Sequence, residues 1–538
     1  MRKSDMLPEP FLAPAALARR RLTLALALAG IGSGCGGGGG GSSPAPAPGP
    51  PPAPGVPGPA WSGFAHDAQH SAQSVVATQS LIRIAWQTPV DLAPQFLPGN
   101  VLLAHYGSPV ITANNTVIVP VKTGATGGFR VEARSGSNGG LIWSADIDYI
   151  LPPHQWTPSF NPALSSAGRL FVPAAGGKLL LRDNADAATG SLQTAVFYGA
   201  AVYAAAPAQL DASVFINTPV TIDSQGNAFF GFIANAGNPA GLRSGIARLA
   251  ADGSGRWAAA SDLATDAAIS KMATNCAPAL SPDGSTLYVA VNIASVSGTV
   301  QRGSLLALDS TSLALKSRVA LVDPQARVPA RVSDDSTASP TVGPDGDVYY
   351  GVLEANFGTH NGRGWLLHFD ATLGTTKTPG SFGWDDTASI VPVAMVPSYR
   401  GSSSYLLATK YNNYGGVGTG DGLNRMAVLD PNDAQAEAIS SVAVMREVLT
   451  ILGPTPESVG ATAVKEWCVN TVAVDPLGSA VLVNSEDGYL YRWDLRSNSF
   501  TQRIQLTGGI GEAYTPTAIG ADGAVYAVNT AVLFSITR

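Results

Sequence analysis

Two pairs of adjacent carboxylates stand in nearly the same local sequence and could do chemistry together. Asp334 and Asp335 begin the run DDSTAS. Asp385 and Asp386 begin the run DDTAS. Carboxylates in this number suit Ca²⁺ or a cationic or polyhydroxylated ligand, and four on one surface repel each other unless water or a cation separates them. The pattern predicts an acidic ligand site with Asp335 and Asp386 as metal ligands; two solvated loops are the alternative.

Other polar and aromatic residues hold the equivalent place ahead of further short apolar segments. An aromatic ring among them could stack on a ligand, while the charged residues bind its polar groups. We assign no catalytic residue, because none of these positions matches a catalytic motif. The candidate ligand residues are His105, His154, Trp156, Lys271, Asp334, Asp335, Asp385, Asp386, Glu466, Trp467, Glu512 and Tyr514.

Several other kinds of site find no support in the sequence. The three cysteines are far apart and form no CxxC pair, so Cys276 and Cys468 are expected to be small buried hydrophobes. His66 and His70 are four residues apart in HDAQH, without the glutamate of a zinc-protease motif, and are expected in a polar lead-in loop. A Gly-x-Ser-x-Gly elbow is missing as well, which leaves a hydrolase triad without support.

The composition favours many short strands. The 538 residues are 45% hydrophobic and only 13% charged, and they include 60 glycines and 39 prolines. A chain with so many glycines and prolines is not expected to form long helices, and the fold class expected is all-β. The formal charge of -6 offers nothing to attract a polyanion, so no nucleic-acid partner is expected.

One pattern recurs eight times along the chain. Each copy has a polar residue or two, a short apolar segment with an early proline, a turn with Asp, Ser or Gly, and a second apolar strand. The average spacing is about 58 residues, which is typical of a propeller or a solenoid. The copies begin at Ser108, Asn161, Thr218, Ala277, Ser339, Val391, Asn470 and Thr515.

The two ends of the chain favour a closed ring. The last copy stops at Arg538 after about three strands, and 81–90 reads as an extra strand without a unit of its own. If that strand completes the last unit, no sheet edge stays exposed. The prediction is an eight-bladed β-propeller of four-stranded blades, in which N- and C-terminal strands share one blade.

Certain segments resemble the PQQ-like, or quinoprotein alcohol dehydrogenase-like, superfamily of eight-bladed propellers. The run ARSGSNG at 133–139 fits the inter-blade docking pattern of that group, with Ser and Asn in place of its Asp and Thr. The resemblance covers most of 61–538 and implies a PQQ-like propeller there. Other residues that carry it are Trp61, Asp67, Trp86 and Trp143.

Catalytic members of this superfamily use PQQ and Ca²⁺, a tryptophan under the quinone and, in many cases, two adjacent cysteines. This chain has no adjacent cysteines. We therefore expect no cofactor, with PQQ and Ca²⁺ as the alternative. Because the superfamily includes both enzymes and pure scaffolds, the fold alone does not decide the function.

The N-terminus reads as an export signal. Three arginines precede an apolar run at 22–31 that is too short to span a bilayer, and small residues follow before Cys35. This arrangement resembles bacterial lipoproteins, which implies a signal peptide at 1–34 and a lipid on Cys35. The Gly/Pro-rich segment 35–60 would be a flexible tether. The alternative is ordinary signal cleavage and release as a soluble protein.

Together these features predict an outer-membrane lipoprotein that faces the periplasm or the cell surface. Its propeller would be a binding or scaffolding module for a protein or glycan, and we expect a binding protein rather than an enzyme. A PQQ-dependent alcohol or sugar dehydrogenase and a carbohydrate-binding or carbohydrate-cleaving propeller are the alternatives.

Overall fold

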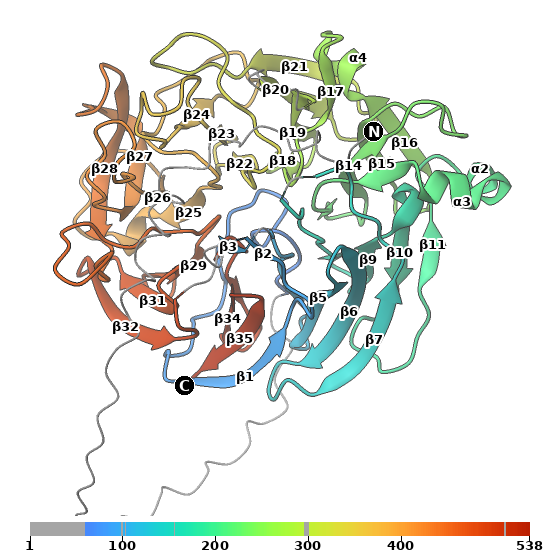
Figure 1. Cartoon of the computed structure of the whole chain (residues 1–538), viewed down its shortest axis with the longest axis horizontal. Helices are drawn as coiled ribbons and strands as arrows, with labels where there is room; N and C mark the ends of the chain where they lie inside the picture. Colours follow the sequence, from blue (N-terminus) through green and yellow to red (C-terminus); the bar gives the residue numbers. More distant parts are fainter. Residues whose placement is uncertain (1–59, 98–100, 103, 155, 295–300, 510–512) are drawn as a thin grey trace, which may run out of the picture.

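The chain forms a ring of eight antiparallel sheets around a central channel (Figure 1). This computed structural model describes residues 60–97, 101–102, 104–154, 156–294, 301–509 and 513–538. Each sheet is one blade, and blades are numbered here in chain order. The innermost strand of each blade begins at one end of the channel, called the front mouth, and finishes at the other, called the rear mouth. The eight-bladed all-β prediction is confirmed.

Four of the blades are regular four-stranded meanders that run outward from the channel. Their innermost strands are two to four residues long, because the turn residues follow almost at once. The first blade contains β4 (Val110–Ile111), β5 (Thr116–Gly124), β6 (Gly127–Ser135) and β7 (Leu141–Ile147). The second contains β8 (Ala163–Leu164), β9 (Leu170–Pro173), β10 (Leu179–Arg182) and β11 (Gln193–Ala195). The sixth contains β25 (Ser389–Pro392), β26 (Tyr405–Tyr411), β27 (Arg425–Ala436) and β28 (Ala443–Leu452), and the seventh contains β29 (Ala473–Asp475), β30 (Ala480–Asn484), β31 (Tyr489–Asp494) and β32 (Ser499–Gln505).

Three blades depart from this plan. In the third and fourth, two short segments pair in succession with the same second strand. The third contains β12 (Val214–Ile216), β13 (Thr221–Ile222), β14 (Ala228–Ala234), β15 (Gly245–Leu249) and β16 (Gly255–Ala259), and the fourth contains β17 (Ile269–Met272), β18 (Ala279–Leu280), β19 (Thr286–Ile293), β20 (Gly303–Asp309) and β21 (Leu315–Ala320). The fifth contains β22 (Thr341–Val342), β23 (Val348–Val352) and β24 (Trp365–Phe369), and isolated bridges from β24 to Thr376 and Gly380 form its outer edge.

The two ends of the chain meet in the eighth blade, as predicted. Strand β1 (Arg83–Pro89) pairs with β35 (Val532–Thr537) from Arg83 opposite Thr537 to Pro89 opposite Val532. The inner strands of the same blade are β34 (Val525–Asn529) and β33 (Ala518–Ile519). The ring is therefore closed by hydrogen bonds between the first and last strands of the chain (Figure 1).

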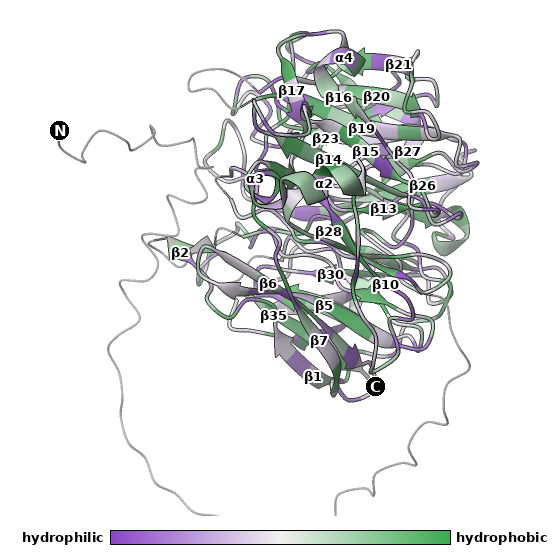
Figure 2. Cartoon of the chain, turned by 90° about the vertical axis from the view of Figure 1, so that its right-hand side faces the viewer, coloured by the Kyte–Doolittle hydropathy of each residue, from purple (hydrophilic) through white to green (hydrophobic). Residues whose placement is uncertain are grey.

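Helices are short and lie in the loops between strands. Within the described residues, the α-helices are α2 (Ala200–Ala205), α3 (Pro207–Asp211) and α4 (Ala260–Ala264), and the 3₁₀ turns are η2 (Ala175–Gly177) and η3 (Val393–Met395). A small hairpin of β2 (Phe96–Leu97) and β3 (Val101–Leu102) lies on the face that is turned toward the viewer in Figure 1. This face is on the left in Figure 2. Among the described residues, no helix is long and apolar enough to cross a membrane.

Tryptophans dock neighbouring blades. Trp86 of β1 donates from Nε1 to the main-chain oxygen of Gly136, 2.8 Å away, in the first blade. Gly139 has a left-handed φ of 71°, and a Cβ there would lie 2.7 Å from the Trp86 ring. In the same way, Trp143 donates to the oxygen of Ala185, 2.7 Å away, in the second blade. The run at 133–139 therefore has the inter-blade role that its resemblance implied.

Hydroxyl groups connect the innermost strands around the channel. Thr221 donates to the main-chain oxygen of Pro278 in the next blade at 2.6 Å, and Thr341 does the same to Ala388 at 2.7 Å. Ser389 continues the series to Val472 at 2.8 Å. The short strands around the channel thus hold the segments ahead of them in fixed positions.

The segment 61–80 closes the rear mouth. It forms main-chain hydrogen bonds with six of the eight innermost strands, in each case with the second residue of the strand; these residues are Ile111, Leu164, Leu280, Val342, Ile390 and Val474. His70, in its middle, is buried, and its Nδ1 donates to the main-chain oxygen of Pro340, 2.6 Å away. As expected, His66 and His70 lie in a loop that leads into β1, but this loop fills the end of the channel and buries His70. The signal, Cys35 and nearly all of the tether lie outside the described residues.

Candidate functional site

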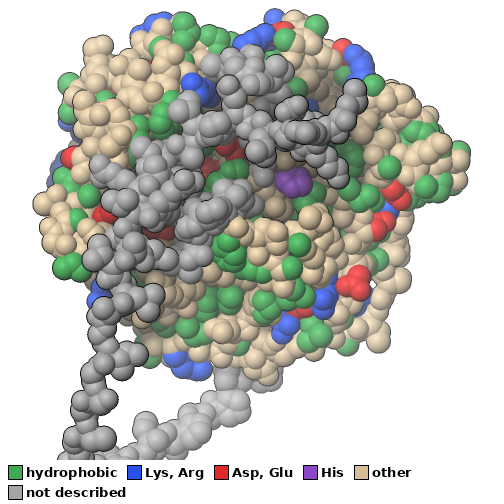
Figure 3. Space-filling model, viewed as in Figure 1, with side chains coloured by type: hydrophobic (Ala, Val, Ile, Leu, Met, Phe, Trp, Pro, Cys, Tyr) green, Lys and Arg blue, Asp and Glu red, His purple; other side chains and the backbone are tan. Residues whose placement is uncertain are grey.

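The front mouth collects side chains from the segments that precede the innermost strands. Since all of these segments end at the same end of the channel, residues far apart in the sequence meet there. Figure 3 shows this face, with acidic side chains and a histidine near its middle. The structure brings together three of the predicted aromatic and five of the predicted charged positions here: His105, Trp156, Tyr514, Lys271, Asp334, Asp335, Asp385 and Asp386.

Three aromatic rings form a cluster at the centre of this mouth. The ring of His105 stacks on Trp156 with centroids 5.1 Å apart and an angle of 18° between the planes. Tyr514 meets both rings edge-on, at 5.2 Å from His105 and 5.9 Å from Trp156. His105 also reaches across the ring, where its Nε2 lies 3.0 Å from the main-chain oxygen of Asp335. The first, second, fifth and eighth blades all contribute to this cluster.

The contacts of His105 define its protonation. A carbonyl oxygen only accepts, so Nε2 must carry the proton in the bond to Asp335. Burial lowers the pKa of His105, which keeps the ring neutral near pH 7. Nδ1 is then an acceptor, and among the described residues it has no hydrogen-bond partner, although His105 is only 3% exposed. A buried acceptor of this kind is uncommon and indicates a place for water or a ligand.

Asp334 is neutralised by a lysine from the fourth blade. Its Oδ1 forms an ion pair with Lys271 and accepts from Asn292 at 2.9 Å, while its Oδ2 accepts from Gln301 at 3.1 Å. Burial alone would raise the pKa of Asp334, but the charge and hydrogen bond of Lys271 outweigh it and hold that pKa below its usual value. Asp334 is thus held by the protein's own donors.

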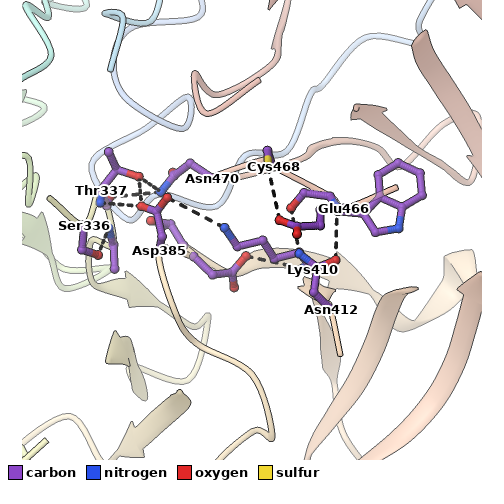
Figure 4. Close-up of polar contacts among 12 residues, drawn as sticks. Ser336, Thr337, Asp385, Lys410, Asn412, Glu466, Cys468 and Asn470 are labelled. Atoms are coloured by element: carbon purple, nitrogen blue, oxygen red, sulfur yellow. Dashed lines mark hydrogen bonds and ion pairs between the residues drawn. The ribbon is translucent and has the colours of Figure 1, made fainter. Parts of the chain in front are cut away.

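Asp385 and Asp386 have different partners although they are adjacent. Asp385 accepts from the main-chain nitrogen and the hydroxyl of Thr337, at 2.6 and 2.5 Å, and its Oδ2 is 3.9 Å from the Lys410 ammonium (Figure 4). Asp386 accepts from Thr409 at 2.6 Å and is 2% exposed. Burial raises the pKa of Asp386 to about 7. Both carboxylates are buried, so the solvated-loop alternative is wrong for this pair.

Asparagines tie together blades that are not neighbours. Asn470 of the seventh blade donates to the hydroxyl of Thr337 in the fifth, at 2.7 Å (Figure 4). Asn275 of the fourth blade accepts from the main-chain nitrogen of Ser159 in the second, at 2.9 Å. Each asparagine has one buried amide atom without a partner in the described part of the chain, Oδ1 in Asn470 and Nδ2 in Asn275. Like His105, these side chains offer unused hydrogen-bonding capacity inside the channel.

Two of the remaining predicted ligand residues, His154 and Trp467, do not join this group. His154 is exposed, and its Nδ1 lies 2.7 Å from the oxygen of Pro152. Trp467 is 1% exposed and packs against Tyr491 and Phe500 between blades, so it is a core residue. Glu512 lies outside the described residues.

The metal prediction for Asp335 and Asp386 stays a prediction. Asp335 accepts from Ser333, and Asp386 accepts from Thr409, so each carboxylate already has a protein donor. Burial raises the pKa of both. Glu466, the last predicted position, lies instead beside Cys468 and Glu486.

Sequence reasoning missed the groups that hold the acidic pairs, chiefly Lys410, Thr337 and Asn470. A lysine inside the apolar run YLLATKY was a signal for Lys410, because such a strand position is seldom charged unless it is paired. Cys276 is buried, as expected. Cys468 is also buried, but its Sγ lies 3.2 Å from Glu486 Oε2, so the expectation of a purely hydrophobic setting is wrong for this thiol.

The fold is that of quinoprotein-type eight-bladed propellers. The chain is similar to a europium-containing methanol dehydrogenase, with 10% identity, coverage of 88% of this chain and 89% of that one, and a TM-score of 0.50. It is also similar to the quinohemoprotein alcohol dehydrogenase of Comamonas testosteroni, with 12% identity, coverage of 89% and 80%, and a TM-score of 0.52. Comparisons with protein families and with curated proteins find no match. At such identities the likeness concerns the fold alone.

Proposed function

We propose that this protein is a membrane-tethered, extracytoplasmic propeller that binds a hydroxyl-rich ligand, such as the end of a glycan, in the front mouth of its channel. One observation carries the proposal: the buried Nδ1 of His105, beside two other aromatic rings, is an acceptor that no described residue donates to. Such a nitrogen calls for a donor from outside the protein, and a sugar hydroxyl is one.

The surroundings of His105 suit a sugar. Sugar rings present apolar C–H faces that pack against aromatic rings, and Trp156 and Tyr514 supply such rings. The Lys410 ammonium is 3.9 Å from Asp385, too long for a direct hydrogen bond, so it could donate to a ligand oxygen. Asn470 and Asn275 add an unused acceptor and an unused donor. A polyol both donates and accepts, which matches this mixture of groups.

The proposed tether suits a site on this face. The described chain starts at the rear mouth, where Trp61 pairs with Ile111. A lipid-bearing Cys35 would therefore be linked to the propeller on the side opposite the candidate site. The front mouth then stays free for a ligand. We place the protein at the outer membrane, with secretion as a soluble protein the alternative.

A quinone-dependent dehydrogenase is the second candidate, and the raised pKa of Asp386 favours it, because a buried carboxyl that titrates near pH 7 suits a general base. The residues present do not fit PQQ, however. One face of Trp156 is covered by His105, Trp467 is in the core, and Cys276 and Cys468 are free cysteines in different blades. We therefore derive no reaction step through this cofactor.

The test is calorimetric titration of the purified full-length chain with a panel of mono- and oligosaccharides. For the saccharide that binds, Trp156→Ala should weaken binding at least tenfold, which corresponds to about 1.4 kcal/mol. His154→Ala is the matched control, because this exposed ring lies two residues away and outside the cluster. Binding that survives Trp156→Ala unchanged, or no saccharide bound at all, would refute the proposal. A quinone absorbance band after reconstitution with PQQ and Ca²⁺ would favour the second candidate.

A further inference from the structure

We propose that Glu466, Cys468 and Glu486 form a binding site for a divalent transition metal of the zinc type. This site is separate from the sugar site proposed above, and neither depends on the other. Among the described residues, these three form a group of possible metal ligands whose donor atoms all lie within 4.8 Å of one another.

The distances match a tetrahedral metal. A zinc ion with Zn–S of about 2.3 Å and Zn–O of about 2.1 Å keeps its ligand atoms roughly 3.4–3.6 Å apart. The Sγ of Cys468 lies 3.2 Å from Glu486 Oε2 and 4.0 Å from Glu466 Oε2. Shifts of a few tenths of an ångström would therefore bring both sulfur–oxygen distances to the spacing of a tetrahedral site.

The local backbone presents two of the ligands on one side. In an extended segment, alternate residues point the same way, so Glu466 and Cys468 share a side and Trp467 faces the core behind them. Asn412 fixes the segment between them, because its side chain accepts from the Trp467 nitrogen at 3.1 Å and donates to the Trp467 oxygen at 3.2 Å (Figure 4). The third ligand is tied in as well, since the Glu466 nitrogen donates to Glu486 Oε1 at 3.1 Å.

The chemistry of the three ligand side chains indicates which metal ions the site would bind. One thiolate and two carboxylates suit Zn²⁺ or Co²⁺, whereas Ca²⁺ and Mg²⁺ take oxygen ligands alone. Cys468 is 6% exposed, which protects a thiolate bound there from solvent. With three protein ligands, the fourth position would hold water, as in open zinc sites.

The experiment is a Co²⁺ titration of the full chain in a Cys35→Ser background, so that Cys276 and Cys468 are the remaining thiols. We expect a near-ultraviolet thiolate-to-cobalt band, lost on addition of Zn²⁺, and a higher melting temperature with Zn²⁺. Cys468→Ser should abolish the band, and Glu486→Gln should weaken Zn²⁺ binding at least tenfold. The matched control is Cys276→Ser, which removes a buried thiol in the fourth blade and should leave the band unchanged.

Two outcomes would overturn the proposal. One is the absence of a thiolate–cobalt band in the Cys35→Ser protein. The other is a band that persists in Cys468→Ser or disappears in Cys276→Ser. Should Cys468→Ser fail to fold, Glu486→Gln decides, because it keeps the thiol and removes one oxygen ligand: unchanged Zn²⁺ affinity in that variant contradicts the site.

Discussion

His105 and Asp335 are joined across the ring, from the first blade to the fifth, by a hydrogen bond of 3.0 Å from an imidazole nitrogen to a main-chain oxygen. Because the acceptor belongs to the backbone, the bond does not depend on the carboxylate of Asp335. It sets the distance between two opposite segments of the front mouth.

Because of this bond, substitutions at His105 and at Asp335 should affect stability differently. His105→Phe keeps an aromatic ring but leaves the Asp335 oxygen without its donor, and we expect a loss of about 1–3 kcal/mol in the free energy of unfolding. Asp335→Asn keeps the bond and should not be less stable at pH 7, because burial raises the pKa of this carboxyl and so disfavours its charged form. Urea denaturation followed by tryptophan fluorescence measures both. Equal losses in the two variants would contradict the assignment.

Closure by the chain ends predicts a sharp difference between two terminal deletions. Removal of 524–538 takes away β34 and β35 and leaves β1 without a partner, which exposes sheet edges and apolar faces. Removal of 36–57 takes away only the Gly/Pro-rich tether. The first deletion should abolish soluble expression or strongly lower the melting temperature, and the second should do neither. Similar behaviour of the two proteins would show that the shared blade does not hold the ring together.

Asp386 predicts a pH dependence of stability. Burial raises the pKa of Asp386 from 3.8 to about 7 in the folded protein. Between these two pH values the folded protein keeps the Asp386 proton, whereas the unfolded chain has lost it. Stability contributed by this group is therefore present below pH 4 and falls as the pH rises to about 7, by about 4 kcal/mol in total. Asp386→Asn removes this fall.

The measurement is the difference in unfolding free energy between Asp386→Asn and the wild type at several values of pH. It should grow in favour of the variant from pH 4 to pH 7 and then level off. Asp183→Asn, at an exposed carboxylate that pairs with Arg169, is the control, and its difference should not grow in favour of the variant over this pH range. A difference that stays constant with pH would mean that Asp386 is not buried in its uncharged form.

The sequence predicts the ring well, because its signals are local. Turn residues such as Gly284, Gly346 and Gly523 have left-handed φ values of 71–89° and recur in most units, so they mark the hairpins without any knowledge of packing. The place of the strand at 81–90 likewise follows from a count of strands, because the last unit lacks one strand and 81–90 has no unit of its own. Such local features can be recognised from the sequence because they repeat along it.

The candidate site is less predictable, because its bonds join segments that no repeat relates. Asn470 reaches Thr337 over an intervening blade, and His105 reaches Asp335 across the channel. Whether Asp385 meets water or a lysine depends on Lys410, which belongs to the second strand of its blade. Trp467 was predictable in principle, since it alternates with Glu466 and Cys468 and so faces the opposite way.

The segment that closes the rear mouth has a consequence for the order of folding. It belongs to the first part of the propeller to be synthesised, yet Ala72 accepts a hydrogen bond from Val474, four hundred positions further along the chain. Contacts this distant form late, because the entropy of a very long loop must be overcome first. The start of the segment can pair early with Ile111 and Leu164 of the first two blades, but the part around Ala72 stays unpaired until the seventh blade has formed. Closure of the rear mouth is therefore expected among the last steps of folding, after most of the ring has formed.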